Sequence, residues 1–148
     1  MKIELSDTKG AVSFEQGSDL DFTQGQIKLR TRVLSSEVTL VDDDTEIDTA
    51  IDLPAKSKLK SWKVEILSSG GAAVNITSLG QAAGGDVDIF SGAFTLAQNA
   101  AVGTSVQGVV AASGVAPLSA QTNLFMQHAD PGPQPPKVRI TVMIEEIV

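Results

Sequence analysis

The feature that most constrains this chain is an alternation of apolar and polar residues between Ile47 and Ile66, broken once at Pro54. A period of two places successive side chains on opposite faces of an extended strand. Proline cannot donate a ladder hydrogen bond, so it belongs to a turn or an edge. We therefore predict two strands joined by a turn at residues 53–57. The single tryptophan, Trp62, lies on the predicted core face, and the two strands packed through it are the expected nucleus of the domain.

Similar short alternations recur along the chain, and the cleanest runs from Lys137 to Val148. They are separated by Gly, Ser, Asp and Pro turns at intervals of roughly 8 to 12 residues, and no stretch keeps a helical period. This pattern predicts an all-β fold, an antiparallel β-sandwich or jelly-roll-like domain of eight to ten short strands over residues 27–148. Residues 1–26 precede it. They are interpreted either as edge strands of that domain or as an extended arm that pairs with a neighbouring subunit.

Composition excludes several classes of function. The chain has 148 residues and no cysteine, which removes disulfides and thiolate metal sites. Its formal net charge of −7 argues against nucleic-acid binding, because proteins that neutralise phosphates carry excess Lys and Arg. We read no signal peptide and no membrane-spanning segment in the sequence. No cofactor and no small-molecule ligand are expected.

A basic stripe opens the main domain. Residues 27, 29, 31 and 33 are predicted to share the inward face of a strand, with Lys28, Arg30 and Arg32 on the opposite face. The pair Ser35–Ser36 is read as an interruption of this strand. The stripe is interpreted as a solvated face or as a contact for an acidic partner surface or the Asp cluster of another copy. Lys28, Arg30 and Arg32 are accordingly candidate partner-contact residues.

An acidic run follows, from Asp42 to Asp52. Clustered carboxylates are ligands for hard cations such as Ca²⁺, but the run lacks the glycine and the twelfth-position glutamate of an EF-hand loop. We interpret its first part as a solvated loop, with a cation site as the alternative. Lysines follow between Lys56 and Lys63, which predicts opposite charges on adjacent strands.

The segment from Ile89 to Gln127 contains no charged residue. Exposed monomer surfaces normally mix both charge signs, whereas interface cores are depleted in charge. The segment is therefore either buried within the sandwich or packed against another protein. Phe94 is expected in the core, and Phe94, Val106 and Val109 are the candidate contacts if the segment meets a partner.

Catalytic chemistry has little support. The single histidine, His128, precedes a Pro-rich run and is predicted to lie in a loop. No GxSxG elbow accompanies it. The carboxylates of residues 42–52 cluster in one loop and strand, whereas a glycosidase pair flanks a cleft. We predict that the protein is not an enzyme.

Residues 45–80, 86–108 and 138–147 together carry a resemblance. A strand ending in LPA leads to a strand with an apolar core triplet, then a hairpin predicted at the glycine turn of residues 68–71, the TLAQNAA loop and a closing VRITV strand. This order resembles small β-sandwich proteins of tailed-bacteriophage virions, over about residues 37–147. The resemblance implies a structural role, as a head decoration (cement) protein, a head fibre or a tail component, and brings no catalytic residues.

The resulting hypothesis is a capsid decoration protein on the outer surface of the phage head, made in the bacterial host cytoplasm. Its expected partners are itself, as a homotrimer, and the major capsid protein. The alternative is a tail or receptor-binding module that contacts a host glycan. The absence of tyrosine and the single, core-facing tryptophan argue against sugar binding.

Overall fold

The computed structural model describes residues 12–14, 20–22, 29–41, 45–81, 90–110 and 116–147. Within these residues the chain forms ten strands and no helix, which confirms the all-β prediction. The strands are β1 (Val12–Phe14), β2 (Leu20–Phe22), β3 (Leu29–Thr39), β4 (Thr45–Leu53), β5 (Ser57–Ser68), β6 (Val74–Gly80), β7 (Phe94–Leu96), β8 (Ser105–Val109), β9 (Thr122–His128) and β10 (Lys137–Ile147). The described part of the chain thus offers no helix that is long and apolar enough to cross a membrane.

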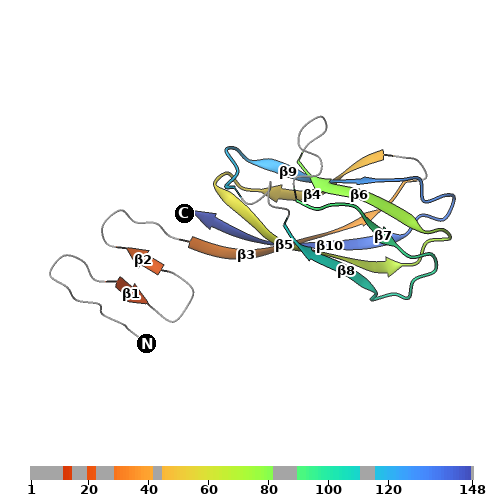
Figure 1. The fold of residues 1–148 in the computed structure, drawn as a ribbon, viewed down its shortest axis with the longest axis horizontal. Coiled ribbons are helices and arrows are strands. Elements are labelled where there is room, and N and C mark those ends of the chain that lie inside the picture. The colour runs from red at the N-terminus through yellow and green to blue at the C-terminus, as the bar shows by residue number, and fades with distance from the viewer. Residues whose placement is uncertain are drawn as a thin grey trace.

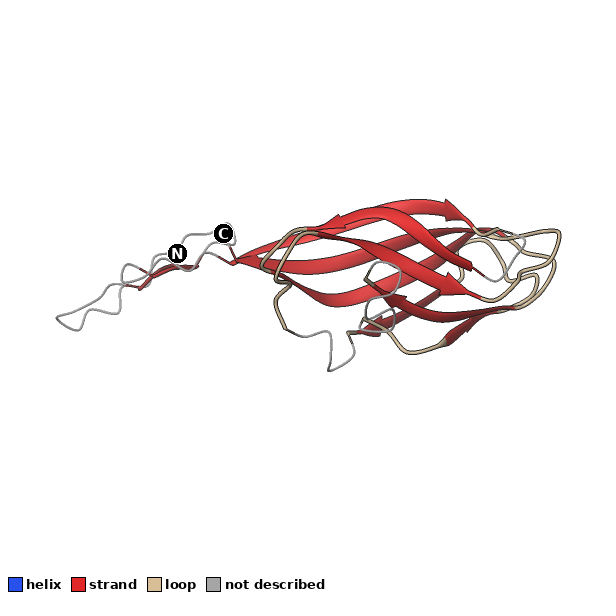
Figure 2. Cartoon of the chain, turned by 90° about the horizontal axis from the view of Figure 1, so that it is seen from above, coloured by secondary structure: helices blue, strands red, loops and turns tan. Residues whose placement is uncertain are grey.

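Strands β3 to β10 form two antiparallel four-stranded sheets, ordered β3-β10-β5-β8 and β4-β9-β6-β7. Figures 1 and 2 show them as two stacked layers. Along the chain every connection passes from one sheet to the other, except that β6 and β7 are neighbours in one sheet. Eight strands wound in this order make a jelly roll. The predicted sandwich or jelly-roll-like architecture is therefore confirmed.

Strand β10 lies at the centre of its sheet, between β3 and β5. Its inward side chains, Val138, Ile140, Val142 and Ile144, are all fully buried. Burying an aliphatic side chain of this size stabilises a fold by about 1.5–3 kcal/mol. This strand therefore anchors one half of the core, as its regular alternation predicted.

Trp62 joins the two sheets near one edge of the sandwich. It extends inward from β5, and its indole stacks on Phe94 of β7 in the other sheet, with ring centroids 4.8 Å apart and planes inclined by 23°. Gly108 of β8 lies opposite Trp62 in the ladder. A Cβ atom on Gly108 would lie 2.8 Å from Cζ2 of the indole, so the ring occupies the space that a side chain would need. The prediction that Trp62 faces the core is confirmed.

Two sequence interpretations of strand pairing are wrong. Strands β4 and β5 lie in opposite sheets, so the acids of one and the lysines of the other are not cross-strand neighbours. The turn at residues 68–71 is not a hairpin either, because it carries the chain from β5 in one sheet to β6 in the other. Gly70 in this link packs against Pro136, where a Cβ atom would come within 2.8 Å of the ring. Alternation specifies which side chains point inward, but it does not specify which strands pair.

Strands β1 and β2 form a separate two-stranded sheet, Val12 pairing with Phe22 and Phe14 with Leu20. The other residues of the segment 1–26 lie outside the described part of the chain. Both interpretations of this segment, edge strands or an arm that pairs with a neighbour, therefore stay predictions.

The close fit of Trp62 against Gly108 generates a stability prediction. Gly108→Ala should lower the free energy of unfolding by about 1–3 kcal/mol, because the new methyl group overpacks the indole. Urea unfolding measures the change. Gly92→Ala is the matched control, since a Cβ atom at Gly92 has nothing within 4 Å. There the smaller entropy of the unfolded chain should leave stability unchanged or raise it by about 0.4–1 kcal/mol. Equal effects at the two glycines would contradict this packing.

Candidate interaction surfaces

The outer face of the β3-β10-β5-β8 sheet carries a row of exposed apolar side chains. Val33 pairs with Met143, Met143 with Ser61, and Ser61 with Val109, so one outward row crosses all four strands. Val33 and Val109 are 67% and 80% exposed, and Met143 is 38% exposed. These residues help line a hollow of about 460 Å³. Exposed apolar side chains around a hollow are typical of a surface that contacts a partner.

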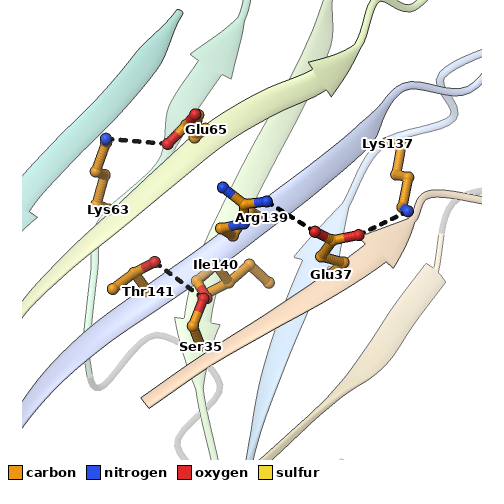
Figure 3. A network of polar contacts seen from close by, with 8 residues as sticks. All are labelled: Ser35, Glu37, Lys63, Glu65, Lys137, Arg139, Ile140 and Thr141. Atoms are coloured by element: carbon orange, nitrogen blue, oxygen red, sulfur yellow. Dashed lines mark hydrogen bonds and ion pairs between the residues drawn. The ribbon is translucent and has the colours of Figure 1, made fainter. Parts of the chain in front are cut away.

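Beside this row lies a network of charged and polar side chains, shown in Figure 3. Glu37 of β3 accepts from Lys137 at 2.7 Å and from Arg139 at 2.8 Å, both on the neighbouring strand β10. On β5, Lys63 pairs with Glu65 at 3.1 Å. The hydrogen bonds from Lys137 and Arg139 hold the pKa of the Glu37 carboxyl below its ordinary value. The network fixes neighbouring strands in register and leaves the charged groups facing solvent.

The structure corrects the predicted faces of the basic stripe. Strand β3 is unbroken from Leu29 to Thr39, so Ser35 and Ser36 do not interrupt it. Leu34 and Val38 pack against the core, so the even-numbered residues of β3 point inward. Because successive side chains of a strand alternate between its two faces, Val33 points outward.

Arg32 is consequently on the inward face, opposite the buried Ile144. Its guanidinium forms an ion pair of 3.5 Å with Glu146 at the end of β10. Arg30 is exposed at the start of β3, and Lys28 lies outside the described residues. Arg30 and Arg32 share the same phase of β3, so neither projects from the outer face beside Val33.

The uncharged segment divides into a buried part and an exposed part. Phe94 is half-buried against Trp62, and Val106 is half-buried and packs on the core. Val109 points outward from β8, and Val102 in the preceding loop is 66% exposed. Residues 97–105 are exposed apart from a half-buried position at 100. Because β7 and β8 are terminal strands of their sheets, this part of the segment forms one side of the sandwich, called here the uncharged edge (residues 94–109).

The prediction that His128 lies in a loop is wrong. His128 is the last residue of β9 and is only 2% exposed. Its Nδ1 lies 2.9 Å from the carbonyl oxygen of Ala129. The inward phase of β9, shared with Leu124 and Met126, places the ring in the interior. A histidine in this position is out of reach of an external substrate.

The acidic residues of β4 have structural partners. The two carboxylate oxygens of Asp48 accept hydrogen bonds from the Ala50 amide and the Asn123 side chain, each at 2.8 Å. These bonds hold a bulge at which Ala50 has a φ of 57°. Among the residues that the structure describes, no group of three or more His, Cys, Asp or Glu side chains is placed to hold a metal ion. Asp42–Asp44 lie outside those residues, so the cation alternative for the whole run stays a prediction.

Comparison with known proteins supports the fold. No protein-family model matches this chain, and no curated protein matches it by sequence. Solved structures do match. A chain of the cyanophage Pam1 capsid superposes with a TM-score of 0.58 and 15% identity, over 80% of this chain and 86% of that one. A chain of the capsid of Ralstonia phage GP4 gives a TM-score of 0.54 and 14% identity, over 82% and 85%.

The same fold also occurs outside phages. A chain from the disulfide-linked pili of Bacillus endospore appendages gives a TM-score of 0.51 and 11% identity, over 85% of this chain and 94% of that one. At such identities the likeness establishes the fold, and the function must be argued from the surfaces. The β-sandwich of phage virion proteins that the sequence resembled is thus the architecture observed.

The Glu37 network generates a pH prediction. Since the folded pKa of Glu37 is lowered, its ionised form stabilises the fold above the unfolded pKa, and this stabilisation is lost as the pH falls through the folded pKa. Glu37→Gln should therefore be slightly less stable than the wild type at pH 7 and low salt, and the difference should vanish in acid. Urea unfolding across pH measures it. Asp52→Asn, which removes an exposed carboxylate outside this network, is the matched control for the loss of one negative charge. Equal stability of Glu37→Gln and the wild type at pH 7 would overturn this role.

Proposed function

We propose that this protein is a non-enzymatic structural component of a bacteriophage virion, a decoration protein that stabilises the head. Its proposed partners are other copies of itself, in a homotrimer, and the major capsid protein on the outer surface of the head. The observation that carries the proposal is the uncharged edge, exposed on a jelly roll whose fold occurs in phage capsid chains.

An exposed strand edge offers unpaired backbone groups to any other strand, and natural proteins usually protect such edges with charges or proline. Strand β8 has neither, and β7 is likewise uncharged. The opposite side of the sandwich ends in β3 and β4, which carry Arg30, Glu37 and Glu46 among their charges. This asymmetry supports a protein whose β7/β8 side is covered in its working state, because interface cores are depleted in charge.

A trimer would bring these edges together around a threefold axis. Cyclic trimers are built from heterologous contacts, in which one surface meets a different surface of the next copy. Each copy in a head lattice would also contact the shell beneath it. Many weak contacts that act together on one lattice hold each copy far more tightly than any single contact. Stabilisation of the head would follow from this avidity, without a catalytic step.

The alternative, a tail or receptor-binding module, has weaker support. Glycan sites rely on exposed aromatic rings, and here Trp62 is buried while Phe94 stacks on it. The likeness to a pilus chain does not extend to its linkage either, because disulfides need cysteine and this chain has none. The uncharged edge therefore favours a protein partner.

Binding to phage heads that lack the protein tests this proposal. The wild type should bind in a fixed number per head, measured by co-sedimentation. Val102→Lys places a charge in the uncharged edge and should weaken binding at least about tenfold, because a charge buried at an interface without a partner is costly.

Val41→Lys is the matched control, an exposed valine on the opposite side of the sandwich, and it should bind like the wild type. Absence of binding by the wild type would refute the proposed function. Equal binding by both variants would show that the uncharged edge is not the contact.

A further inference from the structure

The two sheets of the sandwich carry opposite charge. Strands β3, β10, β5 and β8 together hold seven Lys and Arg residues and four Glu residues, a net charge of +3. Strands β4, β9, β6 and β7 hold no Lys or Arg and three acidic residues, a net charge of −3. In a chain with a net charge of −7, one whole sheet is thus cationic.

The outer face of the β3-β10-β5-β8 sheet is called here the cationic face. Arg30, Arg32 and Glu146 have the inward phase, so the outward charges are Lys58, Lys63, Lys137 and Arg139 against Glu37, Glu65 and Glu145, with the exposed Lys60 at a bulge of β5. This excess of positive charge surrounds an apolar centre. Lys63 lines the same hollow as Val33, Met143 and Val109. Lys58 lies opposite Glu145 in the ladder, two positions along β10 from Met143, and so shares the outward phase. The cationic face therefore offers an exposed apolar row bordered by lysines.

The outer face of the β4-β9-β6-β7 sheet, called here the acidic face, has the complementary character. Glu46, Asp48 and Asp52 alternate with the buried residues of β4 and so point outward. Beside them on β9, Phe125 lies between the fully buried Leu124 and Met126, and its half-buried ring is on the outward side. Asp48 pairs with Phe125 in the ladder. An apolar ring thus lies among carboxylates on this face.

We propose that the cationic face of one copy docks on the acidic face of a second copy. Two acidic faces would repel one another, whereas the excess of Lys and Arg on the cationic face attracts the carboxylates of an acidic face. Phe125 supplies an apolar group that matches the exposed row of the cationic face.

The geometry of the sandwich determines what this contact builds. The two sheets lie as two layers (Figure 1), so their outer faces are on opposite sides of the sandwich. The contact is therefore heterologous, and each dimer retains one free face of each kind. It therefore propagates from copy to copy and does not close, and it leaves the uncharged edge free. This inference is independent of the proposed location on a phage head.

Salt dependence of self-association is the first test. The purified full chain is measured by analytical ultracentrifugation over a range of concentrations, at about 0.01 M and about 1 M salt, where the screening length falls from about 30 Å to about 3 Å. The average mass should rise with concentration at low salt, and the association constant should fall at least about tenfold at high salt. A mass that does not change with concentration or salt would overturn the proposal.

Charge reversal then identifies the faces. Lys63→Glu and Asp52→Lys should each weaken self-association at low salt about tenfold or more, since like charges then meet. An equimolar mixture of the two variants should restore association, because each variant again meets an opposite charge. Lys56→Glu, in the turn before β5, changes the net charge by the same amount as Lys63→Glu and should have little effect.

Unfolding midpoints of all variants identify any loss of folding. If Lys56→Glu weakens association as much as Lys63→Glu, or if the mixture fails to restore it, the face-to-face contact is wrong. Head binding is a separate measurement, so this proposal and the proposed function can fail independently.

Discussion

The burial of two inward rows of side chains between two sheets is the constraint on which the rest of this structure depends. On β10 that row is Val138 to Ile144, and on β5 its hydrophobic members run from Leu59 through Trp62 to Ile66. Because a strand has a period of two, committing every second residue to the core leaves the others outward. The apolar row, the Glu37 network and the two charged faces are all consequences of this division, and the strands at the sheet edges supply the uncharged side.

Sequence periodicity predicted the elements in which local pattern and core phase agree. Strand β10 has four aliphatic residues in strict alternation and no competing signal, and the sheet buries all four completely. Pro54 ended β4 where expected, because it cannot join a ladder. The sandwich architecture followed from the number and spacing of such strands. Phe94, which was expected in the core, packs on it. Val106, a candidate partner contact, packs there as well.

The features that the sequence did not predict depend on which strands pair, and the paired strands are far apart in the sequence. The phase of β3 is fixed by Leu34 and Val38 further along the strand, so Val33 is outward and Arg32 inward, the reverse of the prediction. His128 is buried because β9 is paired on both sides, by β4 and β6, up to its last residue. The apolar row was missed because Val33, Met143 and Val109 lie on three strands far apart in the sequence, which come together only in the folded sheet. The sequence already shows that the strand before Pro54 is acidic and the strand after it is rich in lysine. Only the sheet order shows that these two strands belong to opposite sheets.

The claim that the uncharged edge is covered in the assembled particle is central to this account. Backbone amide hydrogen exchange, measured on the free protein and on phage heads carrying it, tests that claim most directly. The account predicts that exchange slows on assembly in residues 97–109, including the edge strand β8, while the edge strand β3 changes little. Slower exchange confined to β3 and β4, or no change at β8, would contradict it.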